Sequence, residues 1–115
     1  MTTDPYQIAN ACHEANRAIT AFVKDVPVQP AWEDCGEDMQ QSCMRGVEFA
    51  MLNPNATLED QHNAWMLERI EQGWTLGAVK DAKKKTHPAL RPYADLAEGV
   101  KLKDAVFRAI VRAFR

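Results

Sequence analysis

Two tryptophans and two histidines lie between residues 62 and 87, at spacings that favour ligand binding. His62 and Trp65 are three residues apart, so on a helix their side chains stand on one face, which Arg69 continues. A glycine then ends the helix, and Trp74 is expected to turn back toward it. Indoles stack on bases, and cations bind phosphates. This set of residues is therefore suited to a flat, anionic, partly aromatic ligand.

Lysines that follow this helix are candidate phosphate ligands, above all Lys80 and Lys85, with Arg69 in the same role. His62 is a candidate hydrogen-bonding group for a base or a ribose. The His87-Pro88 step then favours an extended backbone and a new direction. For each residue taken singly the alternative is structural, because large aromatics are common in cores and runs of lysine are usually solvated.

Catalysis, a cofactor and a metal site are not predicted. His13 and Glu14 are adjacent, so they point to different faces of a helix and cannot form a dyad by themselves. The sequence contains no nucleophile motif, no glycine-rich phosphate loop and no His-x-x-x-His pair. Its three cysteines, Cys12, Cys35 and Cys43, lack C-x-x-C spacing, so we expect free, buried thiols.

Length and charge indicate one intracellular domain. A chain of 115 residues is long enough to bury its own core, and we treat residues 1–115 as one domain. The net charge of -2 argues against a nucleic-acid partner, because binding to phosphate backbones needs a basic surplus. The N-terminus is polar and the apolar runs are shorter than a membrane span. We therefore expect a cytoplasmic protein that does not bind membranes.

Hydrophobic periodicity predicts an all-α fold, a compact bundle of four to five helices with irregular loops. Two prolines and one glycine, Pro27, Pro30 and Gly36, indicate that residues 25–37 form a loop, which contains Trp32. Only residues 74–79 could form a short β-hairpin. The predicted helices are 5–23, 37–52, 58–73 and 99–114, with a short helix or turn over 88–96.

Apolar stripes on the first and last helices predict which side chains face the core. On the first helix these are Ile8, Cys12, Ala15, Ile19 and Phe22 or Val23. On the last helix they are Leu102, Val106, Phe107, Ile110, Val111 and Phe114.

A longer pattern surrounds the two tryptophans and resembles a known family. It reads His62-x-x-Trp65, Arg69-Ile70-x-x-Gly73-Trp74-x-x-Gly77, Lys80-Asp81, Lys85-x-His87-Pro88-x-Leu90 and Pro92-Tyr93-x-x-Leu96. These motifs resemble the Ry domain, the repeat named after ryanodine receptors and also found alone in small bacterial and phage proteins. The resemblance covers residues 45–104. The family usually has an aromatic where this chain has Leu76, which weakens a stacking role there.

The resemblance extends upstream to the phage-type, single-copy members, through Ile8-Ala9-x-x-Cys12-His13-Glu14-x-Asn16-Arg17, Trp32-Glu33-Asp34 and Ser42-x-x-x-Gly46-Val47. It implies a ligand as well, since paired Ry repeats of the receptor bind adenine nucleotide in the cleft between them. In those repeats the tryptophan of the His-x-x-Trp motif lies at the ligand, a role that transfers to His62 and Trp65. By our own extension Asn16 would bind a base or ribose, Arg17 a phosphate, and Trp32 would stack.

Two hypotheses follow from these residues. In the first, the protein is a non-catalytic module that binds an adenine-containing nucleotide or a nucleotide-derived signal, such as a cyclic nucleotide or an ADP-ribose derivative. A phage-encoded module of this kind would act as a sponge for a defence signal in the host cytoplasm. In the second, the aromatics only build the core and the surface docks another protein.

Receptor repeats bind their ligand as a pair, but this sequence contains each motif only once. We therefore also predict a homodimer, in which a two-fold axis would bring two such domains together. In the alternative arrangement, the N-terminal helix, with Asn16 and Arg17, walls the pocket within one chain.

Overall fold

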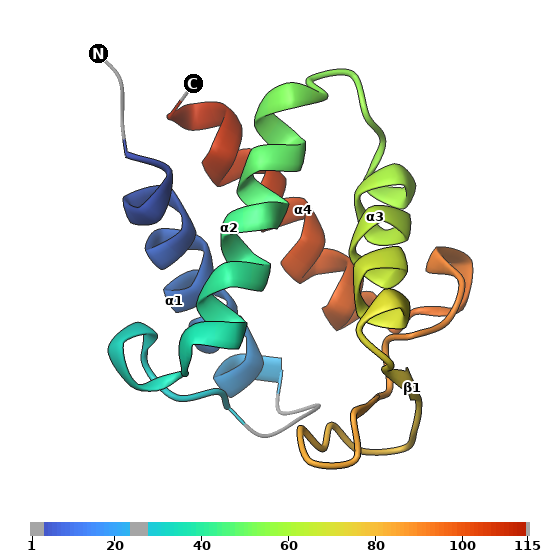
Figure 1. The fold of residues 1–115 in the computed structure, drawn as a ribbon. Coiled ribbons are helices and arrows are strands. Elements are labelled where there is room, and N and C mark those ends of the chain that lie inside the picture. Colours follow the sequence, from blue (N-terminus) through green and yellow to red (C-terminus); the bar gives the residue numbers. More distant parts are fainter. Residues whose placement is uncertain (1–3, 24–27, 115) are drawn as a thin grey trace.

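In a computed structural model of the chain, residues 4–23 and 28–114 are described. Four α-helices dominate the fold, which confirms the predicted all-α class (Figure 1). They are α1 (Pro5–Val23), α2 (Glu37–Leu52), α3 (Leu58–Glu71) and α4 (Glu98–Ala113), and two short 3-10 helices, η1 (Trp32–Asp34) and η2 (Tyr93–Asp95), lie in the connections. Every predicted long helix is present close to its expected bounds.

Local chemistry explains where α3 begins and ends. Thr57 Oγ1 accepts a hydrogen bond from the Asp60 amide at 3.1 Å, and Asp60 Oδ2 accepts one from the Thr57 amide at 3.0 Å. This reciprocal capping box confirms the predicted N-terminus. At the other end Gly73 has a φ of 91°, a conformation that glycine adopts at little cost. The helix that carries the candidate site therefore has both ends defined by its own sequence.

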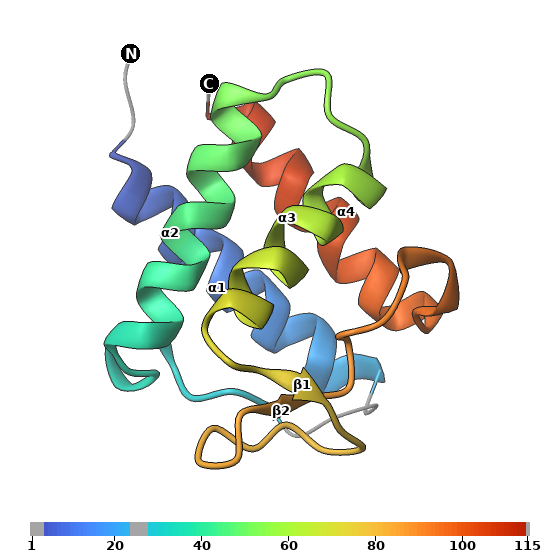
Figure 2. The ribbon, with the colours of Figure 1, turned by 45° about the vertical axis from the view of Figure 1, so that its right-hand side comes forward.

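Two short strands follow α3, β1 (Thr75–Leu76) and β2 (Thr86–His87), and they lie below its C-terminal end in Figure 2. They pair in parallel, with Thr75 opposite Thr86. The expected hairpin within 74–79 is therefore wrong, because β1 pairs with a segment beyond the lysine-rich loop. Gly77 permits this pairing, since a Cβ atom there would lie 2.6 Å from Cβ of Thr86.

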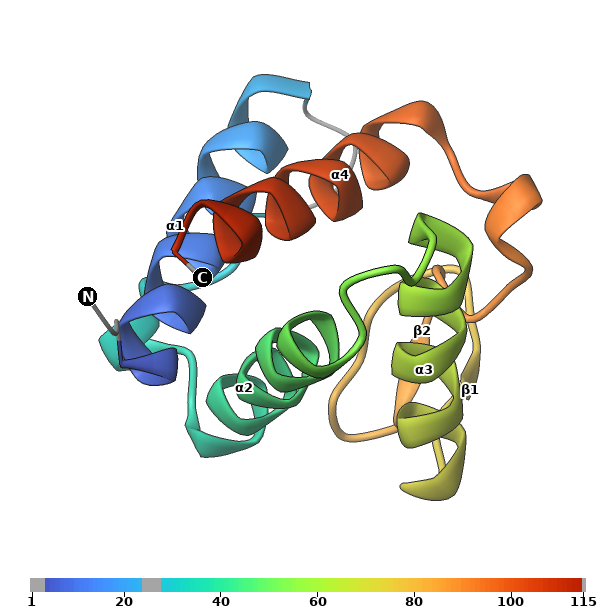
Figure 3. The same ribbon diagram turned by 90° about the horizontal axis from the view of Figure 1, so that it is seen from above.

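The core lies where α1 packs against α4 and α2, which Figure 3 shows from above. Its buried members are Ile8, Ala9, Cys12, Trp32, Val47, Ala50 and Val111. Gly46, in the middle of α2, faces the ring of Phe107, and a Cβ atom there would lie 3.0 Å from Phe107 Cζ. This glycine thus allows the aromatic ring of α4 to approach the α2 backbone closely.

Apolar side chains at three positions that were predicted to pack inward are exposed instead. Phe22 and Val23, the two alternatives at the end of α1, are 88% and 36% exposed, Leu102 is 47% exposed and Phe114 is 45% exposed. All three lie near the ends of α1 or α4, where the predicted stripe continues beyond the neighbouring helices. The middle of the same α4 stripe is confirmed, because Val111 is fully buried and Phe107 and Ile110 pack against the core.

The three cysteines are free, as predicted, and Cys12 is buried while Cys35 and Cys43 are half-buried. Burial raises the pKa of the Cys12 thiol to about 12, and it has the same effect on Cys43. No helix in the described residues combines the length and apolar character that a membrane crossing requires.

Candidate ligand-binding site

The predicted face of α3 is confirmed by direct contact between its side chains. The rings of His62 and Trp65 stack with their centroids 5.6 Å apart and their planes 28° from parallel. His62 is buried, and its Nε2 donates a hydrogen bond to the Arg91 carbonyl at 2.7 Å. That bond fixes the orientation of the imidazole, which in turn supports one side of the indole.

Trp74 returns to the same helix, as predicted. Its amide donates to the Arg69 carbonyl at 2.9 Å, and the Arg69 guanidinium lies 4.9 Å from the centroid of the Trp74 ring. Arg69 is only 6% exposed. Its Nη1 donates a long bond of 3.4 Å to Gln72 Oε1, and its Nε has no hydrogen-bond partner among the described residues. The cation is thus stacked on an indole but poorly satisfied by the protein.

His87 connects the two tryptophans. Its ring lies edge-on to Trp65 at 5.0 Å and tilted to Trp74 at 6.4 Å. Its Nδ1 accepts a hydrogen bond from the Ala89 amide at 3.0 Å, which places the proton of the neutral ring on Nε2. His87 was not among the predicted ligand-binding residues, although the His-Pro motif marked its position.

These rings form a continuous set that we call the aromatic row, which consists of Tyr93, His62, Trp65, His87 and Trp74. Tyr93 of η2 extends the row beyond His62, with a ring separation of 6.1 Å. The row combines residues from α3, the strands and η2, so it depends on the tertiary fold. Arg69 lies at the Trp74 end of it.

Only one of the three tryptophans, all of which lie in the described residues, keeps an accessible surface. Trp32 is 3% exposed and Trp74 is 9% exposed, whereas Trp65 is half-buried. A ligand site requires an indole that a base can reach. Among the three predicted stacking residues, Trp65 meets that requirement.

Three cations act on His87 of the row, and we call Arg69, Lys80 and Lys103 the basic cluster. Burial and the nearby charges of Lys80, Arg69 and Lys103 lower the pKa of His87 to about 4. Burial, followed by the charge of Arg69, lowers the pKa of Lys80 to about 8. Burial likewise lowers the pKa of Arg69. Positive charges therefore oppose one another in a poorly hydrated region.

The basic cluster has no acidic partner in direct contact. In the described part of the chain the ion pairs are Arg17–Glu14, Arg45–Glu68 and Lys101–Glu98, none of which involves the cluster. Lys103 Nζ donates only to Thr20 Oγ1, at 3.5 Å. Buried cations are normally paired, so this arrangement is typical of a site for an anion.

Lys85, which was predicted to bind phosphate, has a structural use. Its backbone has a φ of 55°, which is uncommon for a residue with a side chain, and its Nζ donates to the Gln72 carbonyl at 2.8 Å. That carbonyl is at the C-terminus of α3, where a cation is favourable. Lys85 therefore caps the helix that carries the aromatic row.

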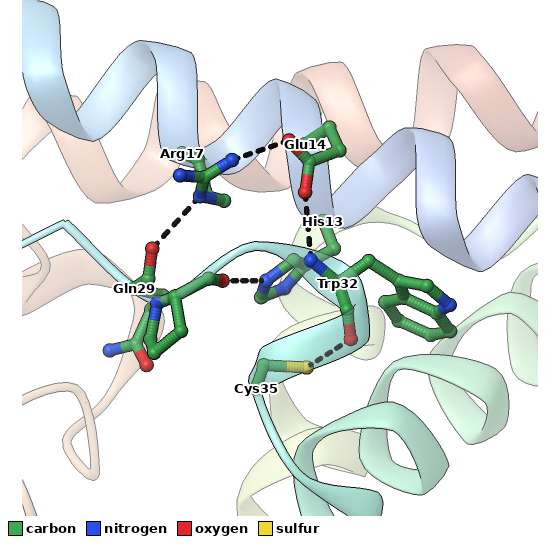
Figure 4. A network of polar contacts seen from close by, with 7 residues as sticks. His13, Glu14, Arg17, Gln29, Trp32 and Cys35 are labelled. Carbon is green, nitrogen blue, oxygen red and sulfur yellow. Dashed lines mark hydrogen bonds and ion pairs between the residues drawn. The ribbon is translucent and has the colours of Figure 1, made fainter.

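In the described part of the chain, Asn16, Arg17 and Trp32 have no ring contact and no hydrogen bond with a member of the aromatic row. Arg17 instead binds Glu14 at 2.6 Å and donates to the Gln29 carbonyl at 2.9 Å, two contacts that are drawn as dashed lines in Figure 4. The second carboxylate oxygen of Glu14 accepts from the Trp32 amide at 2.9 Å. Asn16 is half-buried on α1, and its carbonyl accepts from the Thr20 hydroxyl.

The same contacts hold a loop against α1. His13 Nε2 donates to the Pro30 carbonyl at 2.7 Å, and the Trp32 ring packs edge-on to Tyr6 at 5.2 Å. We call His13, Glu14 and Arg17 the α1 latch. All three side chains bind backbone groups of residues 29–32, so they hold this loop against α1, and the ligand roles of Arg17 and Trp32 stay predictions.

An open depression of about 500 Å³ lies elsewhere, around the loop between α2 and α3. Its lining residues are Phe49, Leu52, Asn53, Pro54, Asn55, Ala56 and Asp60, which include no member of the row or the cluster. Within the described residues no group of His, Cys, Asp or Glu side chains is arranged to hold a metal.

Comparison with known families assigns the chain. The RyR domain family matches residues 50–112, which is more than half of the sequence, so the protein belongs to the RyR domain family. The matched segment contains the whole aromatic row and the basic cluster, and it excludes the α1 latch. No solved structure gives a significant match to the chain.

Proposed function

We propose that this RyR domain is a non-catalytic module that binds an adenine-containing nucleotide or a nucleotide-derived signal. The observation that supports the proposal is the unpaired basic cluster beside a half-buried indole. A nucleotide supplies the two complementary groups, because its phosphates carry negative charge and its base is flat and aromatic.

The charge argument concerns Arg69 and Lys80. The charge of Arg69 lowers the pKa of Lys80, and neither cation forms an ion pair with a carboxylate in the described residues. Such a pair costs folding free energy that a bound anion offsets. A phosphate that bridges them would accept hydrogen bonds from the Lys80 ammonium group and from Arg69, whose Nε has no partner among the described residues.

The stacking argument concerns Trp65. His62 supports one side of the indole and the edge of His87 contacts it, so the ring is held in one orientation. A base stacked on such a ring gains roughly 1–3 kcal/mol. Arg69 follows Trp65 by about one helical turn, which is a suitable separation for a phosphate attached to that base through its ribose.

Two further parts of the proposal concern biology and assembly. If the protein is phage-encoded, sequestration of a defence signal in the host cytoplasm requires only binding, for which no catalytic group is needed. We also infer a homodimer, whose two-fold axis would supply a second half-site to each ligand. The outer side of α3, away from the His62 and Trp65 face, also carries exposed apolar side chains, since Leu67 is 59% exposed and Ile70 is 57% exposed.

The same exposed pair favours the second candidate function, a module that docks another protein. Leu67 and Ile70 are three residues apart and share one helix face. Light scattering at micromolar concentration distinguishes the arrangements. A mass near 13.0 kDa with nucleotide binding intact would show that one chain holds a complete site, and the homodimer would be abandoned.

Calorimetric titration tests the function directly, with AMP, ADP, ATP, ADP-ribose and cyclic nucleotides as ligands. We expect binding of at least one of them, accompanied by a change in tryptophan fluorescence. Absence of heat and of any thermal shift with the whole panel would exclude the nucleotide function. Lys84→Ala is the matched control for Lys80→Ala, because Lys84 is exposed in the same loop.

A further inference from the structure

We propose that His87 is a further ligand-binding residue, whose Nε2–H group donates a hydrogen bond to a phosphate of the bound ligand. The inference rests on the proposed function, which assigns the phosphate to Arg69 and Lys80, and it adds a neutral donor to these two cations. His87 belongs to β2 and was not among the residues that the sequence predicted to bind a ligand.

His87 occupies a central position in the aromatic row. Its ring centroid lies 5.0 Å from that of Trp65, the indole assigned to the base, and 6.4 Å from that of Trp74. The Arg69 guanidinium lies 4.9 Å from the centroid of the same Trp74 ring. Because these side chains are direct neighbours, a ligand that stacks on Trp65 and extends to Arg69 comes close to the imidazole of His87.

One nitrogen of this imidazole is bound, and the other has no partner in the described part of the chain. Nδ1 accepts a hydrogen bond from the Ala89 amide at 3.0 Å, so Nε2 carries the proton of the neutral ring. Nε2 makes no hydrogen bond to a described residue, and it is not one of the fully buried polar atoms that lack a partner. It therefore keeps accessible surface that a ligand can reach.

The other two histidines, which also lie in the described residues, use the same atom differently. Nε2 of His13 donates to the Pro30 carbonyl at 2.7 Å. Nε2 of His62 donates to the Arg91 carbonyl, also at 2.7 Å. Both of these residues are buried, whereas His87 is half-buried. Within the described part of the chain, His87 is thus the histidine whose ring N–H is available to a ligand.

The charges near His87 favour an anionic partner for Nε2. Burial, followed by the charges of Lys80, Arg69 and Lys103, lowers the pKa of His87 to about 4. No carboxylate among the described residues counteracts these cations at the ring. The imidazole is therefore neutral at pH 7, and it can donate to a phosphate oxygen without adding a further positive charge to the basic cluster.

Nitrogen-15 NMR of the histidine side chains tests the inference on the wild-type protein. Saturation with ADP should shift the Nε2 and Hε2 resonances of His87, and pyrophosphate, which has phosphates but no base, should do the same. Adenosine, which has the base and the ribose but no phosphate, should shift them much less. His13 lies in the α1 latch, so its resonances serve as the internal reference.

Two substitutions separate the roles of the two ring nitrogens. In His87→Gln an amide nitrogen can occupy the position of Nε2, whereas in His87→Asn the side chain reaches only the position of Nδ1. We expect His87→Asn to weaken ADP binding about tenfold and His87→Gln to weaken it at most about threefold, as measured by calorimetry. Both variants lose the ring contacts with the tryptophans, so the difference between them reports the donor.

His13→Asn is the matched control, because it removes an imidazole whose Nε2 is bound within the protein. The ADP affinity of its folded molecules should equal that of the wild type. If a variant at position 87 fails to fold, as judged by circular dichroism, the NMR comparison on the wild-type protein still decides the question.

The inference would be overturned by any of three results. Unchanged Nε2 resonances in protein saturated with ADP would show that the imidazole does not contact the ligand, while nucleotide binding itself would stand. Equal losses of affinity in His87→Asn and His87→Gln would assign His87 to packing of the row. A shift caused by adenosine but not by pyrophosphate would place the donor at the base or the ribose.

Failure of the proposed function gives a different result. A pyrophosphate shift at His87 in a protein that binds no nucleotide would remove the nucleotide function and support the phosphate role of this residue. Absence of binding by ADP and pyrophosphate alike would remove both.

Discussion

The α1 latch and the aromatic row use the same residue types for different purposes. Each region combines histidine, arginine and tryptophan once Trp32 is counted with the latch and Arg69 with the row, and each joins different elements of the chain. In the latch, Arg17 is paired with Glu14, and both bind backbone groups of the adjoining loop. In the row, Arg69 stacks on Trp74 with its Nε unsatisfied. The comparison shows that satisfaction of charge, rather than residue type, distinguishes a structural contact from a candidate binding site.

Burial of the tryptophans separates the regions in the same way. Trp32, beside the latch, is 3% exposed and belongs to the main core. Trp65, in the row, keeps part of its surface accessible. The family match agrees with this division, since it includes the row and excludes the latch. Substitutions in the latch should therefore change stability, and substitutions in the row should change binding.

The largest expected effect is on stability, from Trp32→Ala. Removal of this buried indole should cost about 3–5 kcal/mol of unfolding free energy, because it leaves a cavity between α1 and η1. The affinity of the folded molecules for ADP should not change. Urea melts combined with titration at low temperature measure both quantities. A loss of affinity without a loss of stability would place Trp32 at the ligand after all.

The next effect is on binding, from Arg69→Gln. Loss of the charge-assisted bonds to phosphate should weaken ADP binding by about 2–3 kcal/mol. The unfolding free energy should stay the same or rise, because an unpaired buried charge is removed.

Arg17→Gln is the matched control in the latch. It should lower stability by about 1 kcal/mol, because it removes a partly exposed ion pair and a hydrogen bond to the loop. ADP affinity should be unaffected. Calorimetry and chemical melts of both variants test the pair. If the two arginine variants weaken binding equally, the proposed distinction between latch and row is wrong.

Trp65→Ala has a comparable or smaller expected effect on binding. Loss of base stacking should weaken ADP binding by roughly 1–3 kcal/mol, measured by calorimetry on protein whose helical circular dichroism is retained. Unchanged affinity in a folded variant would assign Trp65 a packing role only.

The smallest effect is a difference in pH dependence between two variants. Folding lowers the pKa of His87 from 6.5 to about 4, so the unfolded chain binds this proton first and stability falls as pH falls through that window. Folding raises the pKa of Asp104 from 3.8 to about 6, so its contribution increases as pH falls from about 6 to 3.8. The two contributions therefore oppose each other.

Chemical melts between pH 4 and 6.5 should reveal this opposition. Compared with wild type, Asp104→Asn should lose stability more steeply on acidification, and His87→Gln less steeply, by about 1 kcal/mol across the window. Parallel curves for all three proteins would show that neither group is perturbed by folding.

The shared face of the α3 side chains was predictable, because it depends only on their spacing within one helix. The spacing of His62, Trp65 and Arg69 determines their shared face, and the capping residues determine where the helix starts. Residues that depend on a partner far away in the sequence were not predictable. The structural contact of Arg17 is an example, because nothing in the sequence shows that the Gln29 carbonyl would accept its hydrogen bond.

The residues that were missed come from other elements. His87 reaches the row through the parallel pairing of β1 with β2, and that pairing crosses a loop whose path the sequence does not specify. Lys103 and Asp104 lie on the face of α4 that also carries Phe107 and Val111, although charged residues are normally solvated. Lys85 offered a usable signal, since a lysine near a helix C-terminus can cap its carbonyls.

The contacts of Thr86 close the loop between β1 and β2, and they restrict how this loop can open. Thr86 pairs with Thr75 in parallel, exchanges two backbone hydrogen bonds with Asp81 at 3.0 and 3.1 Å, and its hydroxyl donates to the Val79 carbonyl. Lys80 and His87 are thus carried by one closed ring of backbone, whose opening requires several bonds to break together. Amide hydrogens of Thr75, Asp81 and Thr86 should therefore exchange with solvent as a single cooperative unit.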